Sequence, residues 1–356
     1  MKKINFNKNN QFYLFLIITV CAIFFRYYNY NLQDFWWDEL MEFSTTNPEL
    51  TFKETFLRAH SLTPGTKLSY DYATNANFYF YIYKFFLGFS YTPGTARLIT
   101  ASIGLLVFFI SIFIFKQFIG KNYIPLSLLL ASNYYLIIQS QEYKYNIFFC
   151  LICLLSIYSF FLWIKKTNTK KEKTLKIFSF IFLLLTVWTH IFGFLLYLTQ
   201  LIVVFFKKRD LFFRNIQYFI FLPLIYLLIN FQQLKNFFSI KEFPVPQKSF
   251  EFFFDYDFKY FFGSIISGKI FLVVFVLLII YSIKKLKNMK FEIIFLYILF
   301  FLTYFLPLTY SLISKPIFQT RYVIYIIPVI LFLIVFLTDF LKSNLIRNSI
   351  LVFLIL

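Results

Sequence analysis

Residues 95–115 read TARLITASIGLLVFFISIFIF, and this stretch decides what kind of protein the chain forms. After Arg97 it carries no charged side chain as far as Phe115. An apolar run of about 20 residues crosses a bilayer as a helix, because lipid offers the backbone no hydrogen-bond partner outside the segment itself. Ten further runs have the same character, at 11–27, 122–139, 145–164, 175–189, 191–206, 215–232, 269–283, 291–313, 321–340 and 346–356. The stretch at 175–206 could also form one long helix, so we predict an all-α polytopic membrane protein with about eleven transmembrane helices.

The composition agrees with this class. Of the 356 residues, 60% are hydrophobic and 14% are charged, and the mean hydropathy is +0.70. These values exclude an ordinary soluble domain. Cys21, Cys150 and Cys153 lie within apolar runs, so we interpret them as small hydrophobic residues and not as a redox pair. No small-residue cleavage site follows the first run, which favours a retained signal anchor.

The formal net charge of +19 follows the loops of this layout. With the N-terminus placed in the cytoplasm, the cytoplasmic segments hold 21 of the 35 Lys and Arg residues but only four of the 16 acids. This asymmetry is the one that the positive-inside rule describes. We therefore attribute the charge to orientation in the lipid bilayer, and we expect no nucleic acid partner.

Two loops on the outer side are long, at 28–94 and 233–268. Residues 76–92 in the first loop are apolar, but they are rich in tyrosine and carry Lys84, which favours an interfacial helix. If this segment crossed the membrane, every later loop would change sides and the charge asymmetry would be lost. No soluble domain or internal repeat is visible, so residues 1–356 are predicted to form a single transmembrane domain.

Acidic residues gather in the first outer loop, where residues 35–43 read FWWDELMEF. Asp38 and Glu39 follow Trp36 and Trp37 at a predicted membrane surface, where ionisable groups are costly and water is partly excluded. A carboxylate in such a place can act as a general base toward a substrate hydroxyl. The alternative is an aromatic belt with a solvated acidic turn, and the residue types alone leave both interpretations open.

Five further ionisable residues on the outer side are candidates for a functional site. Glu142 and Lys144 share the turn QSQEYKYN, which is either functional or the polar tip of a helical hairpin. His190, in WTHIFG, is either a hydrogen-bonded structural residue or a substrate contact. Arg97 and Arg321 each begin an apolar run, where a guanidinium group either marks the interface or binds a phosphate.

The order of these motifs resembles the GT-C superfamily of polytopic glycosyltransferases, of the glycosyltransferase family 39 type. The branch is that of the protein O-mannosyltransferases and the aminoarabinose transferase of lipid A. The order is WWDE, the aromatic stretch NANFYFYIYKFF, TARLITASIGLL, SQEYKYNIFF, THIFG and QTRYVIYIIP, and it covers residues 11 to about 335. The chain departs from the family in the lysine at position 144, where the family has arginine, and in the missing proline signature of the aromatic stretch.

The resemblance implies roles for ten residues. Asp38, Glu39 and Glu142 would be catalytic, Arg97, Lys144, Arg321 and Tyr322 would bind the donor phosphate, and Trp37, Tyr145 and His190 would contact substrate. Asp38 would be the base, and a single displacement at the anomeric carbon would invert its configuration. Fixed cations would stabilise the charge on the departing phosphate. No His and Asp spacing requires a metal, and a divalent ion bridging Asp38 and the phosphate is left open.

The resemblance also implies the partners and the location. The donor would be a polyprenyl-phosphate-linked sugar, the acceptor a glycan, lipid or protein, and the active site would face outward from a bacterial inner membrane. Two alternatives remain. A polysaccharide polymerase or ligase on the same carrier would favour arginine in the late outer loops, but 233–268 has four Lys and no Arg. A transporter or flippase would favour internal repeats and spans broken at the midplane, and we find no repeat.

Overall fold

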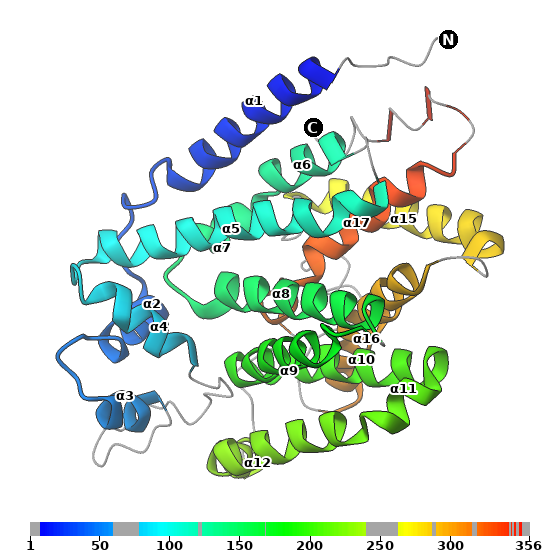
Figure 1. The fold of residues 1–356 in the computed structure, drawn as a ribbon. Coiled ribbons are helices and arrows are strands. Elements are labelled where there is room, and N and C mark those ends of the chain that lie inside the picture. Colours follow the sequence, from blue (N-terminus) through cyan, green and yellow to red (C-terminus); the bar gives the residue numbers. More distant parts are fainter. Residues whose placement is uncertain are drawn as a thin grey trace.

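The computed structural model describes residues 8–59, 78–119, 123–167, 169–239, 263–286, 290–314, 319–341, 343, 345–346 and 349–350. These ranges contain 15 α-helices and one 3-10 helix, and no strand occurs within them. In chain order the elements (Figure 1) are α1 (Lys8–Tyr27), α2 (Trp37–Thr45), α3 (Phe52–Ala59), α4 (Phe78–Leu87), α5 (Pro93–Ile119), α6 (Tyr123–Ser132), α7 (Tyr134–Gln141), α8 (Tyr145–Lys165), α9 (Glu172–Thr189), α10 (Gly193–Lys207), α11 (Arg209–Arg214), α12 (Ile216–Ser239), α15 (Ile265–Leu286), α16 (Phe291–Ile313), η4 (Thr320–Val323) and α17 (Ile326–Thr338).

The predicted all-α membrane architecture is confirmed. Four helices, α1, α5, α8 and α16, are long and apolar enough to cross a membrane, and five shorter apolar helices accompany them in the described residues. The stretch at 175–206 forms two helices, α9 and α10, which are separated at His190. The predicted run at 346–356 lies largely outside the described residues.

The run at 122–139 is not the single span that the sequence predicts. The side chain of Asn133 accepts the backbone N–H of Leu136 at 3.0 Å and so caps α7, which forces a break after α6. The buried guanidinium of Arg26 in α1 donates to the carbonyl of Leu130 at 3.1 Å. That carbonyl belongs to the last turn of α6, where the helix itself supplies no donor. The prediction was wrong because a capping side chain and a buried arginine stabilise the break.

Helix α8 lies in the interior of the bundle, between α5 and α9 (Figure 1). In the most apolar 18-residue stretch of α8, 83% of the residues are buried inside the protein, against 17% in the corresponding stretch of α1. A helix that is apolar on every side belongs in an interior or in lipid, and the one charged side chain of α8, Lys165, lies at its C-terminal end. Cys150 and Cys153 are free and buried in α8, as expected of small hydrophobic residues. The packing of α8 fixes its N-terminal end, where Lys144 and Tyr145 lie.

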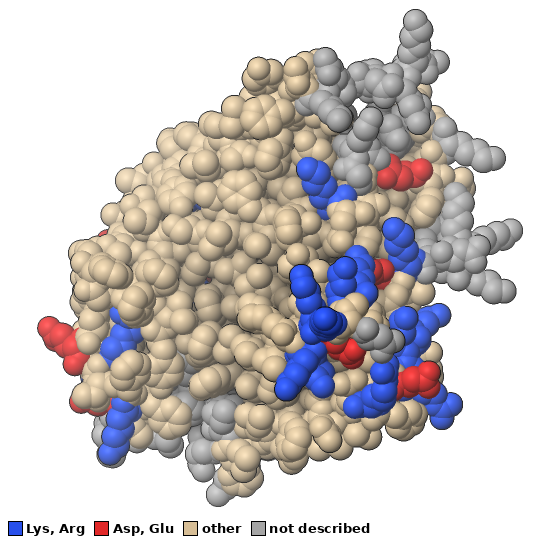
Figure 2. Space-filling model, in the orientation of Figure 1, with Lys and Arg blue, Asp and Glu red and all other residues tan. Residues whose placement is uncertain are grey.

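The short helices of the first long loop, α2, α3 and α4, gather at one end of the bundle (Figure 1). Helix α4 has ten residues, which is too short to cross a bilayer. Lys and Arg side chains crowd mainly the opposite end, around α11 and the C-terminal end of α8 (Figures 1 and 2). Residues 60–77 of the first loop and 240–262 of the second lie outside the described residues.

Candidate functional site

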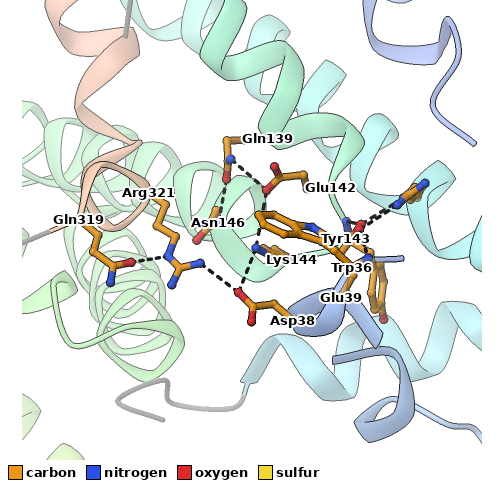
Figure 3. Close-up of polar contacts among 11 residues, drawn as sticks. Trp36, Asp38, Glu39, Gln139, Glu142, Tyr143, Lys144, Asn146, Gln319 and Arg321 are labelled. Carbon is orange, nitrogen blue, oxygen red and sulfur yellow. Dashed lines mark hydrogen bonds and ion pairs between the residues drawn. The ribbon is translucent and has the colours of Figure 1, made fainter. Parts of the chain in front are cut away.

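The start of α2 separates two neighbouring carboxylates (Figure 3). Trp36 precedes the helix, and its backbone N–H donates to Glu39 Oε2 at 3.4 Å, which closes the first turn. Acidic side chains are favourable in a first turn because the helix dipole is positive there. Asp38 and Glu39 leave this turn toward different partners, and they define two clusters with different properties.

The closed cluster consists of Glu39, Arg97 and Tyr143. Arg97, in α5, donates from Nε to Glu39 Oε1 at 3.1 Å and from Nη2 to Oε2 at 2.8 Å. This bidentate pair is buried, and the backbone N–H of Tyr143 also donates to Oε1 at 2.6 Å. The guanidinium further donates to the carbonyls of Gln33 and Asp34. The closed cluster therefore joins α2, α5 and the turn before α8 with its polar groups already occupied.

The open cluster consists of Asp38, Lys144 and Arg321 (Figure 3). Asp38 Oδ2 accepts from Lys144 Nζ at 3.3 Å and from Arg321 Nη1 at 3.3 Å. The Asp38 side chain is 49% exposed. Partial burial raises the pKa of Asp38, but the positive charges of Lys144 and Arg321 outweigh it and hold the pKa below its usual value. The fold thus places one accessible, ionised carboxylate between two cations.

Neighbouring side chains hold the two cations in place. Gln319 Oε1 accepts from Arg321 Nε at 2.6 Å. The Lys144 ammonium lies 3.9 Å from the centroid of the Trp36 ring, within the range of a cation–π interaction. Glu142 Oε2 lies 4.0 Å from Lys144 Nζ on a third side. Each cation therefore has one contact with Asp38 and at least one further contact that positions it.

Glu142 belongs to a polar chain that leads away from the open cluster. It is the C-cap of α7, and its Oε2 accepts from Gln139 Nε2 at 3.1 Å. Gln139 Oε1 in turn accepts from Asn146 Nδ2 at 2.7 Å. Burial raises the pKa of Glu142, while the charge of Lys144 opposes this shift. Glu142 therefore lies behind Lys144, on a rigid support.

An aromatic group lies next to Arg321. The ring of His190 stacks on Tyr145, with centroids 5.4 Å apart, and lies 4.6 Å from the ring of Tyr322. His190 Nδ1 accepts the backbone N–H of Phe192 at 3.2 Å, so the ring proton belongs on Nε2. Nε2 is buried and has no hydrogen-bond partner in the described part of the chain. Burial lowers the pKa of His190 to about 3, and the imidazole is therefore neutral.

The structure divides the predicted site residues into groups. Asp38, Glu142, Lys144 and Arg321 come together, with His190, Tyr145 and Tyr322 beside them, whereas Glu39 and Arg97 pair with each other in the closed cluster. Trp37 is 62% exposed, and its neighbour Trp36 contacts Lys144 instead. Sequence reasoning missed Trp36, Gln139 and Gln319 as supports. Gln319 lies two residues before Arg321, and Gln139 lies one helical turn before Glu142. These short spacings in the sequence could have indicated that each glutamine contacts the nearby charged side chain.

Asp38 already has two positively charged neighbours. Its Oδ2 atom contacts Lys144 Nζ and Arg321 Nη1, each at 3.3 Å. In the ranges that the structure describes, no group of three His, Cys, Asp or Glu side chains could hold a metal.

Comparison with known proteins places the fold. No family model and no curated protein sequence matches the chain. The solved structure of ArnT from Cupriavidus metallidurans bound to undecaprenyl phosphate is similar, with a TM-score of 0.61 and 12% identity over 94% of this chain and 61% of the ArnT chain. The apo structure of ArnT has a TM-score of 0.61 and 14% identity over 94% of this chain and 60% of that chain. The chain therefore spans about three fifths of the length of ArnT. The helical membrane fold expected from the order of the motifs is confirmed: the chain is an integral membrane protein whose fold is similar to that of ArnT over the part that the two chains share.

Proposed function

We propose that the protein is a membrane glycosyltransferase that moves a sugar from a polyprenyl-phosphate donor to a hydroxyl of a glycan, lipid or protein acceptor. The observation that carries this proposal is the open cluster, in which Lys144 and Arg321 flank the accessible carboxylate of Asp38. A solved ArnT structure with the same fold contains undecaprenyl phosphate, which supports a lipid phosphate as part of the donor. A carboxylate and two cations are the groups that transfer from a sugar phosphate requires.

Each step of this reaction has a candidate residue. The acceptor oxygen attacks the anomeric carbon and passes its proton to Asp38, while the bond from that carbon to the phosphate oxygen breaks. The phosphate leaves with the bonding electrons, and Lys144 and Arg321 stabilise its charge. A phosphate leaves readily as an anion, so no separate acid is needed at the leaving oxygen. One displacement inverts the anomeric configuration.

Donor binding would also activate the base. In the free protein both cations contact Asp38 and hold its pKa below its usual value, which makes it a weak base. A donor phosphate that takes over contacts with Lys144 and Arg321 reduces this effect. The proton affinity of Asp38 then rises when the donor is in place, and Asp38 is ready for the acceptor hydroxyl.

The other predicted residues take supporting roles. Glu39 and Arg97 occupy each other's hydrogen-bonding groups, so we assign them to positioning α2 and not to direct contact with phosphate. Glu142 positions Lys144. Tyr145, His190 and Tyr322 form an aromatic wall beside Arg321 for the sugar or the carrier, and exposed Trp37 is available to the acceptor.

The proposed orientation follows from the distribution of charge. Lys and Arg gather mainly at the end of the bundle away from α2 and α3 (Figure 2), and the positive-inside rule assigns that end to the cytoplasm. The open cluster then faces the outer side of a bacterial inner membrane, and the N-terminus lies in the cytoplasm. Labelling of single cysteines with a membrane-impermeant reagent tests this orientation independently of activity.

Sugar transfer tests the function. Membranes carrying the wild type or Asp38→Asn, at matched expression, are incubated with radiolabelled polyprenyl-phosphate sugars. Loss of a general base predicts a rate at least about 100-fold lower for Asp38→Asn. Asp34→Asn is a matched control, because its side chain is exposed in the same loop and only its backbone carbonyl contacts Arg97. If Asp38→Asn transfers as fast as an active wild type, Asp38 is not the base. A wild type that transfers from no donor favours the transporter instead.

A further inference from the structure

A third acid of α2 lies beside the open cluster. Glu42 follows Asp38 by four residues, so the two side chains lie on the same face of the helix. The electrostatic interactions of Glu42 are with Lys144, Asp38 and Arg321, the three members of the cluster. On the other side, the hydroxyl of Tyr79 in α4 hydrogen-bonds to its carboxyl group.

One oxygen of Glu42 has no hydrogen-bond partner among the residues that the structure describes. The residue as a whole retains some exposure, but its Oε2 atom is buried and makes no hydrogen bond to any described residue. A buried polar atom without a partner lowers stability, because it has lost its hydrogen bonds to water without replacing them. Such atoms are few in folded proteins and often point to a missing ligand or to a catalytic role. Glu39, three residues earlier, has both of its oxygens occupied, so incomplete pairing is not general in this helix.

The surroundings of Glu42 favour the protonated acid. Burial raises the pKa of Glu42 to about 8, against the opposing effects of Lys144, the Tyr79 hydrogen bond and Arg321. Asp38 adds to the upward shift by like-charge repulsion, and the hydroxyls of Tyr83 and Tyr143 also interact with the carboxyl group. Unlike a carboxylate, a protonated carboxyl group can donate one hydrogen bond while it accepts others.

We infer that Glu42 positions a substrate by a hydrogen bond from its protonated carboxyl group to a hydroxyl of the sugar or of the acceptor bound at the open cluster. This inference rests on the proposed function. Asp38 and Glu42 then divide two tasks between two acids one helical turn apart. The ionised acid accepts the proton of the reaction, and the neutral acid holds a hydroxyl group without repelling the phosphate.

Transfer kinetics from pH 6 to 9.5 test the inference with radiolabelled polyprenyl-phosphate sugars. Glu42→Gln supplies a neutral donor and acceptor in the same place, and we expect it to retain at least about a fifth of the wild-type kcat/KM at pH 7. The wild-type rate should fall above about pH 8 as Glu42 ionises, and Glu42→Gln should lack this fall. Glu42→Ala should lower kcat/KM by about 10-fold or more. If the bound hydroxyl belongs to the sugar, the KM for the donor should rise. If it belongs to the acceptor, the KM for the acceptor should rise.

Two controls separate a role in substrate positioning from a structural one. Binding of sugar-free undecaprenyl phosphate should be equal in the wild type and both Glu42 variants, because the cations bind the phosphate. Glu49→Gln, an exposed acid in the same loop, should leave transfer unchanged. The inference is overturned if Glu42→Ala transfers sugar as fast as an active wild type. It is also overturned if the transfer rate of Glu42→Gln still falls above about pH 8. A wild type that transfers from no donor overturns the proposed function together with this inference.

Discussion

Asp38 and Glu39 are neighbours in sequence with the same functional group, yet the structure gives them opposite surroundings. Glu39 is 1% exposed, and both of its oxygens accept hydrogen bonds from Arg97 and from the backbone. Asp38 is half-exposed and makes two contacts of 3.3 Å with cations from other elements. A carboxylate whose partners are complete stabilises the fold, whereas one with incomplete partners retains capacity for a substrate.

The two clusters also differ in charge. In the closed cluster, one carboxylate and one guanidinium balance each other in a buried, bidentate pair. In the open cluster, two cations, Lys144 and Arg321, flank the one half-exposed carboxylate of Asp38, and Glu142 lies 4.0 Å from Lys144 outside the cluster. Cations held in a partly dry environment attract an anion such as a phosphate. The comparison therefore predicts that mutations in the closed cluster change stability and mutations in the open cluster change transfer.

The largest expected effect is on the stability of the closed cluster. Glu39→Gln leaves Arg97 buried without its counter-ion, and breaking a buried pair in this way costs about 3–5 kcal/mol. We expect Glu39→Gln to unfold in detergent at a clearly lower midpoint temperature than the wild type. Intrinsic tryptophan fluorescence measures this midpoint. Asp38→Asn, at a half-exposed position, should change the free energy of unfolding by about 1 kcal/mol or less.

A double variant sharpens this prediction. Glu39→Leu combined with Arg97→Met replaces the pair by apolar groups of similar size, and such replacements are often neutral or stabilising. The double variant should therefore unfold at a higher temperature than Glu39→Gln alone. If Glu39→Gln and Asp38→Asn destabilise the protein equally, the distinction between the two clusters is wrong.

The next largest effect is expected at Arg321. In the proposed mechanism Arg321 stabilises the departing phosphate, and loss of one such group is expected to lower kcat by about 10²- to 10³-fold in Arg321→Gln. The unfolding midpoint should stay close to that of the wild type, because the Arg321 side chain is one third exposed. Arg321→Lys keeps the charge but not the planar guanidinium group, so its transfer rate should lie between those of the wild type and Arg321→Gln. If Arg321→Gln lowers the unfolding midpoint strongly and changes the transfer rate little, Arg321 stabilises the fold and does not act on the phosphate.

The sequence predicted the fold better than it predicted the roles of the site residues. Apolar runs and the order of the motifs were sufficient for the fold, because hydrophobic length is a local property. They could not show that Arg97 pairs with Glu39, since that contact joins α5 to α2 across 58 positions. For the same reason the sequence did not distinguish Trp36 from Trp37, or reveal the unpaired oxygen of Glu42. Roles depend on which neighbours the packed chain supplies.

The pH dependence of transfer should differ between the wild type and a Lys144 variant. In the proposed mechanism Asp38 is the base and acts only when ionised, so activity is expected above its pKa and should be lost as the pH falls through it. Lys144 and Arg321 hold this pKa below its usual value, and the acid limb of kcat/KM should therefore lie at low pH. Lys144→Met removes one of these cations and should move the acid limb to higher pH. Lys144→Arg keeps the charge and should leave the limb near its original place.

These profiles are compared after each is normalised to its own maximum, because Lys144→Met should also lower the maximal rate. An acid limb that stays in place in Lys144→Met would show that Asp38 is not the titrating base. A limb that moves to lower pH would require a different group, since removal of a positive charge cannot make a carboxyl group more acidic.

The smallest expected effect compares the two tryptophans. The ring of Trp36 lies 3.9 Å from Lys144 Nζ, and a cation–π interaction contributes about 0.5–2 kcal/mol. Trp36→Leu should therefore weaken binding of undecaprenyl phosphate by about 2- to 30-fold, the equivalent of that energy. Trp37 is exposed, and Trp37→Leu should leave this binding unchanged even if its ring contacts the acceptor. If Trp37→Leu weakens phosphate binding more than Trp36→Leu, the lipid carrier contacts the exposed ring directly. The phosphate site would then extend along the start of α2 beyond the open cluster.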